Sequence, residues 1–177
     1  MLKKIGLGLL ALIVAFLGFV ATRESKFHYE RSDVIAAPAD KIFPLISNFK
    51  MGEQWTPYEK VDPNMKKNFT GNDGQVGSVY EFEGNMEVGT GKLEMLNIVP
   101  NELVEIKLTM IKPFFGENHI QYKLTPEGAG TRFTWTMSGD GGFMSKLMSV
   151  LIDCDKMIGD QFLQGINNLK AIVEVRQ

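Results

Sequence analysis

The chain has 177 residues, of which 44% are hydrophobic and 23% charged, a composition that excludes extended disorder and collagen-like structure. About 155 residues follow an apolar N-terminal stretch, enough for one domain that buries about 70% of its unfolded surface. That remainder carries all 21 acidic side chains but not Lys3 and Lys4, so it is net negative, which argues against nucleic acid as a partner.

The first predicted element is an uncharged apolar helix from Ile5 to Thr22. Its length of about 18 residues is close to the roughly 20 needed to cross the hydrocarbon core of a bilayer. We therefore expect residues 1–22 to form a transmembrane anchor and residues 23–27 to form a tether. The bilayer would then be a partner of the chain.

A cleaved secretory signal is the alternative for the same segment. Cuts after Ala21 or Thr22 would leave Phe19 or Val20 three residues upstream, where a small residue is expected, so the sequence favours an uncleaved anchor.

The charges beside the apolar segment indicate its orientation. Lys3, Lys4 and the terminal amine precede it, whereas Arg23 and Lys26 follow it beside Glu24. The positive-inside rule then predicts a single-pass protein with a cytoplasmic N-terminus and a periplasmic or other extracytoplasmic domain, as in a bacterial inner membrane. The charge margin is about one, and a cytoplasmic domain is the alternative.

The soluble part begins with a strand and two short helices. A strand is predicted from His28 to Ala36, followed by a helix that has Pro38 in its first turn. Pro44 is expected to kink or end this helix, and a second short helix is predicted from Asn48 to Gln54.

From Met65 onward the apolar residues alternate with period two, which predicts an antiparallel sheet with one buried face. A turn at residues 71–74 is expected to join two strands, and Tyr80 and Phe82 share a face of the second. Further strands are predicted at Glu87–Ile98, Leu103–Met110, Glu117–Thr125 and Thr131–Gly139.

The chain ends with a predicted helix from Phe143 to Glu174. Its apolar residues recur at three- and four-residue steps: Leu147, Leu151, Cys154, Ile158, Phe162, Ile166, Leu169 and Val173. One continuous helix of about 30 residues is roughly 45 Å long and can lie right across a curved sheet.

This order of elements resembles the SRPBCC superfamily, which includes START-related lipid-transfer domains, and is most similar to its polyketide cyclase/dehydrase and lipid transport branch. The resemblance covers residues 28 to about 175, and the domain it predicts comprises residues 28–177. The segments that carry it are Ala37-Pro38-Ala39-Asp40-Lys41-Ile42-Phe43, Trp55-Thr56-Pro57, Gly74-Gln75-Val76-Gly77-Ser78-Val79-Tyr80, Gly130-Thr131-Arg132-Phe133-Thr134-Trp135 and Asp155-Lys156-Met157-Ile158-Gly159. It implies an α+β helix-grip fold, in which a curved antiparallel sheet wraps around a long C-terminal helix. It also implies an apolar ligand between sheet and helix, with no universal catalytic residues.

Two side chains are candidates for chemistry, Asp155 and Tyr80. Asp155 lies about 60° from the centre of the apolar stripe of the last helix, where it could be an acid or base with a raised pKa, or an anchor for a polar ligand group. A hydrated or ion-paired boundary residue is the alternative. Gly165 falls inside the stripe and Gly159 at its edge, which indicates either space for a ligand or close packing.

Most of the remaining candidates are aromatic or sulfur-containing side chains expected to point inward. The predicted ligand-binding set is Trp55, Tyr80, Phe82, Met110, Tyr122, Trp135, Met137, Leu151, Asp155, Ile158 and Phe162. The alternative is that these residues are ordinary core.

No cofactor or metal is predicted. His28 and His119 lie on separate predicted strands and have no cysteine or carboxylate cluster beside them in the sequence. The segment from Gly141 to Met148 combines a flexible start with an apolar first turn, so it could be a portal facing the bilayer or simply part of the core.

Three functions remain open from the sequence. The preferred one is a membrane-tethered module that binds a lipid or other apolar small molecule between sheet and helix, because no catalytic constellation stands out. The alternatives are a cyclase-like or dehydratase-like enzyme using Asp155 or Tyr80, and an assembly or chaperone-like partner of another membrane protein, whose identity the sequence does not indicate.

Overall fold

The computed structural model describes residues 2–174, so the last three residues of the predicted domain lie outside it. The helices are α1 (Leu2–Ala21), α2 (Ala39–Ile46), α3 (Phe49–Gly52), the 3-10 helix η1 (Pro57–Lys60), α4 (Gly142–Leu151) and α5 (Cys154–Val173). The strands are β1 (Lys26–Ile35), β2 (Lys66–Thr70), β3 (Val79–Glu83), β4 (Thr90–Val99), β5 (Leu103–Lys112), β6 (Gly116–Glu127) and β7 (Gly130–Asp140).

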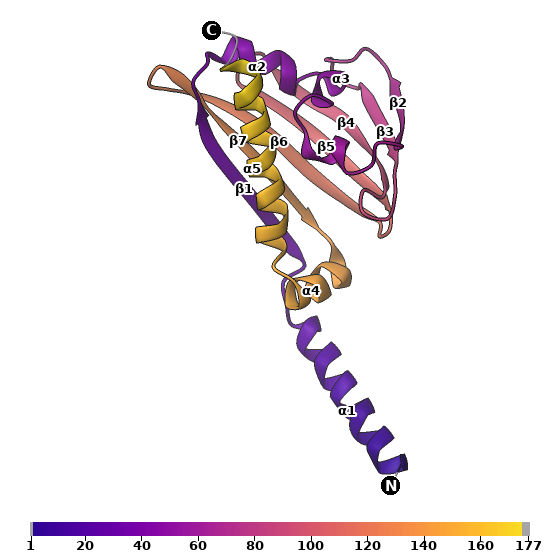
Figure 1. Ribbon diagram of the computed structural model, residues 1–177. Helices are drawn as coiled ribbons and strands as arrows, with labels where there is room; N and C mark the ends of the chain where they lie inside the picture. Colours follow the sequence, from indigo (N-terminus) through magenta and orange to yellow (C-terminus); the bar gives the residue numbers. More distant parts are fainter. Residues whose placement is uncertain (1, 175–177) are drawn as a thin grey trace.

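The strands form one seven-stranded antiparallel sheet in the order β1-β7-β6-β5-β4-β3-β2. Strands β2 to β7 follow one another as hairpins, and β1 pairs with β7 from Lys26 opposite Asp140 to Ile35 opposite Thr131. Figure 1 shows α5 lying across one face of the curved sheet, with α2 at the end far from α1. The predicted α+β helix-grip architecture is confirmed.

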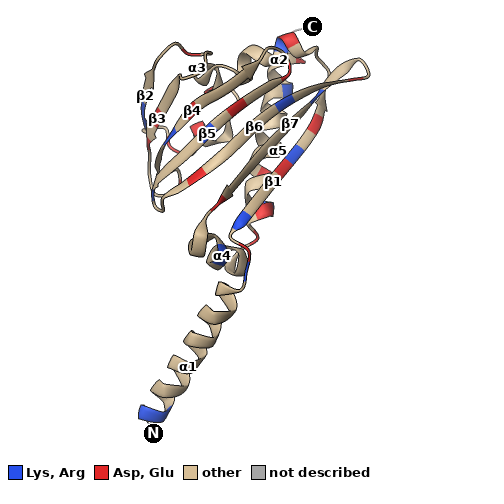
Figure 2. Ribbon diagram, turned by 180° about the vertical axis from the view of Figure 1, so that it is seen from behind, with Lys and Arg blue, Asp and Glu red and all other residues tan. Residues whose placement is uncertain are grey.

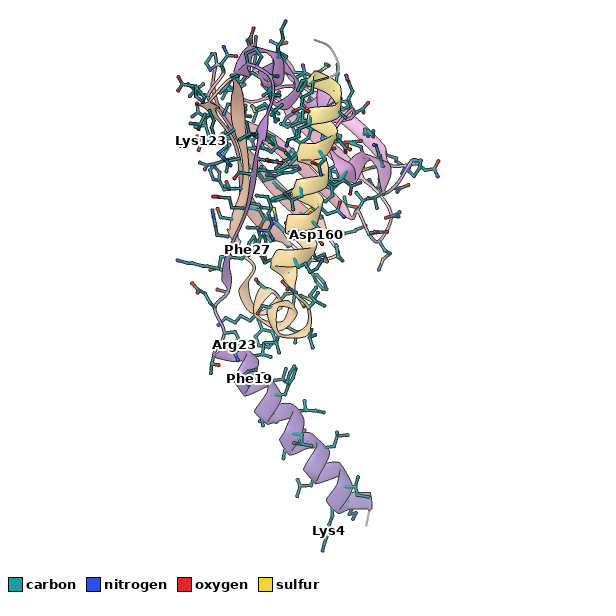
Figure 3. The ribbon with its side chains drawn as sticks, turned by 60° about the vertical axis from the view of Figure 1, so that its left-hand side comes forward. Lys4, Phe19, Arg23, Phe27, Lys123 and Asp160 are labelled. Atoms are coloured by element: carbon teal, nitrogen blue, oxygen red, sulfur yellow. The ribbon has the colours of Figure 1, made fainter. Side chains whose placement is uncertain are left out.

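Period-two alternation explains why one face carries the core. Val104, Ile106, Ile120 and Phe133 are buried on the face that α5 covers. Alternate positions such as Lys123 point away from α5 (Figure 3). Seen from behind, the strands of the uncovered face carry charges of both signs, as expected for a face in contact with water (Figure 2).

The predicted continuous last helix is wrong, because the structure divides it into α4 and α5. Ile152 adopts an extended conformation (φ −139°, ψ 155°), and Asp153 caps α5 by accepting a hydrogen bond from the Lys156 N–H at 2.9 Å. The apolar spacing continues through this break, and therefore the sequence pattern does not reveal it.

Three smaller differences concern where elements begin and end. Pro44 lies inside α2, which ends two residues later at Ile46. The expected turn at residues 71–74 is the first half of a longer connection, in which Gly71, Gly74 and Gly77 all have positive φ. Strand β4 begins at Thr90, three residues later than predicted.

Helix α1 projects from the domain and is long and apolar enough to span a membrane. Figure 3 shows its far end at Lys4 and its near end at Phe19 and Arg23, where the guanidinium lies 4.2 Å from the centre of the Phe19 ring. The near end is docked onto the domain, because Val20 is fully buried and the Lys146 ammonium of α4 donates to the Ala21 carbonyl at 2.9 Å.

Candidate ligand-binding site

The space between sheet and α5 is filled by an aromatic core, made of Trp55, Tyr122, Phe133, Trp135 and Phe162. The Trp135 and Phe162 rings stack with centroids 4.3 Å apart, and Trp55 meets Trp135 edge-on at 5.3 Å. The Trp55 indole N–H donates to the Leu45 carbonyl at 2.9 Å. Four of these rings belong to the predicted ligand-binding set, and they pack against one another here.

The two glycines of α5 are sites of close packing. A Cβ at Gly165 would lie 2.6 Å from Cζ3 of Trp135, and one at Gly159 would overlap the guanidinium of Arg31. At both positions the missing side chain lets a neighbouring side chain approach the helix backbone. The alternative of close packing therefore explains both glycines.

Tyr80, in β3 near the β2 edge of the sheet, is buried in the same core and its hydroxyl belongs to a polar cluster. Its hydroxyl donates to Glu59 Oε1 at 2.8 Å, and Glu59 Oε2 lies 2.5 Å from the Lys67 ammonium, which also contacts Glu53 at 3.0 Å. Burial, and then the hydrogen bond to Glu59, raises the pKa of Tyr80. The phenol therefore keeps its proton at neutral pH and orients Glu59.

Four other members of the predicted ligand-binding set are partly buried around the packed interior. Phe82, Met137 and Ile158 are partly buried and pack against the core, and Met110 is likewise half-buried. These side chains lie at the border of the interior, and Met110 and Met137 are the most adaptable of them because methionine is unbranched.

An open groove of about 630 Å³ lies between the start of β1 and the α4–α5 joint. It is lined by Phe27, His28, Tyr29, Ser149, Val150, Leu151, Ile152, Asp153, Cys154 and Asp155. The break at Ile152 creates this groove, because it turns the two helices apart and leaves Leu151 and Ile152 exposed. Figure 3 shows Phe27 at the base of the domain, above the end of α1.

The predicted member Asp155 lines the groove as a paired anion. Arg31 of β1 donates to its two carboxylate oxygens at 2.8 and 3.2 Å and to its backbone carbonyl at 3.0 Å. The hydrogen bond to this guanidinium lowers the pKa of Asp155, so the carboxylate is ionised at neutral pH. The apolar border alone would favour a raised pKa, and the structure gives the opposite direction because Arg31 is the neighbour.

Sequence reasoning missed Phe27, Tyr29, Arg31 and Ile152. A signal was present in β1, where Tyr29, Arg31, Asp33 and Ile35 share one face. Because Ile35 on this face is buried, the charged residues Arg31 and Asp33 on the same face need partners on the element that covers it. Arg31 finds Asp155, and Asp33 accepts from Lys170 of α5 at 2.6 Å.

A second groove, of about 320 Å³, lies over the β2–β3–β4 end of the sheet. It is lined by Lys66, Lys67, Asn68, Glu81, Phe82, Glu83, Thr90, Gly91, Lys92 and Ile111. Its lining side chains carry charges of both signs. Within residues 2–174, no three His, Cys, Asp or Glu side chains are grouped so as to hold a metal ion.

Comparison with known proteins gives one family and many similar folds. The family described as polyketide cyclase / dehydrase and lipid transport matches residues 26–174. No curated protein matches the chain.

Three solved structures illustrate the fold similarity. Protein MLL2253 from Mesorhizobium loti superposes with a TM-score of 0.64 at 16% identity, over 85% of this chain and 99% of that one. Protein CV1439 from Chromobacterium violaceum gives 0.59 at 17%, over 85% and 97%. The Aha1 dimer from Colwellia psychrerythraea gives 0.56 at 18%, over 84% and 97%.

Proposed function

The chain belongs to the polyketide cyclase / dehydrase and lipid transport family, and we propose that it is a membrane-tethered module that binds a lipid or other apolar small molecule. The proposed entry site is the groove between β1 and the α4–α5 joint. The observation that carries the proposal is the exposed pair Leu151 and Ile152 in a groove whose size is typical of small-molecule sites.

The polar groups of the groove suit a ligand with one polar end. Asp155 in its wall pairs with Arg31 behind it, and burial raises the pKa of Tyr29, also in the wall, to about 12, so the Tyr29 hydroxyl remains a donor. An apolar chain would lie along Leu151 and Ile152 while its polar group meets this pair. Deeper insertion requires the partly buried Met137 and Ile158 to move.

Catalysis by a cyclase-like or dehydratase-like mechanism is the alternative for the same fold. Asp155 and Tyr80 do not contact each other in one site, since Asp155 pairs with Arg31 and Tyr80 with Glu59. Their pKa shifts keep Asp155 ionised and Tyr80 protonated at neutral pH, neither of which is a group ready to exchange a proton. These observations favour binding.

The membrane part of the proposal rests on α1. We propose that it is an uncleaved anchor with a cytoplasmic N-terminus, that residues 23–177 lie on the extracytoplasmic side of a bacterial inner membrane, and that ligands are taken from or presented to that membrane. Such a tethered module would extract, present or sense molecules at one bilayer.

The test is ligand retention by residues 24–177, which lack α1 and its surrounding lipid. After gentle isolation and incubation with phosphatidylethanolamine vesicles, we expect native mass spectrometry to find a bound lipid. Ile152→Asp should reduce its occupancy about tenfold, because a charge is placed in the apolar wall. Val76→Asp is the matched control, since Val76 is also a β-branched apolar residue and exposed but lies outside the groove.

An empty domain under these conditions would contradict the proposal. Equal loss in the two aspartate variants would do the same, because the groove would then have no special role. If Asp155→Asn retained the lipid but abolished turnover of a substrate, the enzyme alternative would replace binding.

A further inference from the structure

Two sheet turns expose large apolar side chains to an unusual degree. Phe114 and Phe115 are adjacent in the β5–β6 turn, with exposed fractions of 53% and 73%, and Met86 in the β3–β4 turn reaches 89%. Single exposed apolar residues are common, but paired phenylalanines at a turn tip are costly in water. An apolar environment outside the domain would remove this cost.

The sheet register places both turns at the end of the domain from which α1 leaves. Met110 pairs with Gly116 of β6 and with Gly91 of β4, so the β5–β6 and β3–β4 turns project from the same end of the sheet. Asn118 of β6 pairs with Gly139 of β7, and Lys26 of β1 pairs with Asp140 of β7, so β1 starts and β7 ends at this same end of the sheet. Figure 1 shows this end of the sheet on the side of α1.

Helix α4 lies at the same end and none of its residues is buried. It follows β7 directly, and Phe143, Leu151 and the adjoining Ile152 are exposed along it. The bond from Lys146 to the Ala21 carbonyl fixes α4 beside the last turn of α1. Helix α4 therefore sits at the level where the apolar part of α1 ends.

The charges at this end favour apolar insertion over electrostatic binding as the mode of contact. Arg23 is followed by Glu24 in the sequence, and Lys26 lies opposite Asp140 in the β1–β7 pairing. A balance of signs gives no strong attraction to anionic lipid, whereas exposed phenylalanines and an amphipathic helix are the usual means of entering the bilayer interface.

We propose that the β3–β4 turn, the β5–β6 turn and α4 form a three-point seat that enters the interface of the bilayer crossed by α1. This inference rests on the proposed anchor and adds an orientation to it. The groove beside α4 then opens at the lipid surface, so a lipid can pass between bilayer and groove without crossing water. The partner is the phospholipid interface of the same bilayer.

The experiment measures how deep single spin labels lie in the full chain, reconstituted into vesicles of phosphatidylcholine with roughly 20% of the anionic lipid phosphatidylglycerol. In a Cys154→Ala background, labels are attached at Phe115→Cys and Met86→Cys, and at Val76→Cys as control. Val76 is 61% exposed but lies in the β2–β3 connection at the opposite end of the sheet. A fourth label at Leu12→Cys reports on α1.

We expect the ratio of oxygen to nickel-chelate accessibility at Phe115 and Met86 to exceed that at Val76 at least threefold. A Phe115 label as aqueous as the Val76 label, with Leu12 deep in the lipid, would overturn the seat and leave the anchor standing. An aqueous Leu12 label would overturn both. A Phe115 label inaccessible to both reagents would indicate a protein contact, such as a second copy, and would also overturn the seat; thermal melting of each variant checks the fold.

Discussion

At the residue scale, Gly165 shows how little space the interior leaves. The nearest atoms to a Cβ placed at this position would belong to Trp135, Pro57 and Trp55, at 2.6, 3.3 and 3.4 Å. All three are parts of rigid rings in or beside the aromatic core. The sequence indicates an unusual glycine in an apolar stripe, and the structure explains it by ring packing.

Gly165→Ala is expected to destabilise the domain by about 1 to 3 kcal/mol, as overpacking does in other cores. Alanine is the better helix former by about 1 kcal/mol, so a loss means that the steric cost exceeds this gain. Urea unfolding followed by near-UV circular dichroism measures the difference.

Gly159→Ala is the matched control in the same helix. The three atoms nearest to its Cβ all belong to the flexible end of Arg31, which can turn away at the cost of a partly exposed ion pair with Asp155. We expect unchanged or slightly higher stability. If both alanines destabilised equally, packing against the rings would not be the cause at Gly165.

A second residue-scale prediction concerns Glu105 on the uncovered face of the sheet. Its carboxylate accepts from Asn97 at 2.9 Å and Gln121 at 2.7 Å, and these bonds lower its pKa. A lowered folded-state pKa adds stability that is present above the unfolded value of about 4.3 and is lost as pH falls through the folded value.

Glu105→Gln should therefore lower the free energy of unfolding by about 1 kcal/mol at pH 7, because the charged acceptor of two bonds is lost. The difference from the parent chain should shrink below about pH 4 and vanish once Glu105 is protonated in both states. Thermal melts between pH 3 and pH 7 test this. A difference that stayed constant with pH would show that charge is not the cause.

At the element scale, the break between α4 and α5 depends on one cap. Asp153 accepts the Lys156 N–H, and Ile152 is extended just before it. Asp153→Ala should cost about 1 kcal/mol and reduce ligand retention in the groove. Asp160→Ala is the control, since Asp160 lies within α5 and its pair with Lys156 is exposed. Equal effects of the two changes would argue against the cap.

The elements differ in how far the sequence determines them. Period-two alternation predicts the strands from β4 to β7 well, because one face is buried and the other wet. The same method fails at Ile152, since a helical period can continue in sequence across a break in the backbone. The groove that depends on the break could therefore not be predicted. Leu151 and Asp155 in its wall are predicted ligand-binding residues, but only because they lie on or beside the apolar stripe of the last helix.

At the scale of the whole molecule, the orientation of the domain is a separate prediction. Cys154 is the single cysteine and is partly exposed, and Val76→Cys adds a more exposed one. In spheroplasts, an impermeant maleimide should label both if the domain is extracytoplasmic. Labelling only after lysis would place the domain in the cytoplasm. Labelled protein released into the medium would indicate a cleaved signal.

The connection between α1 and β1 has one more consequence. Only residues 22–25 separate the two elements, and the Ser25 carbonyl accepts the Gly141 N–H at 3.2 Å, which ties the connection to the turn before α4. Under the proposed anchorage, the domain would find its ligand by lateral diffusion along a surface. Its rate of encounter would then scale with the number of ligand molecules per unit area of bilayer, and diluting the surrounding solution would leave that rate unchanged.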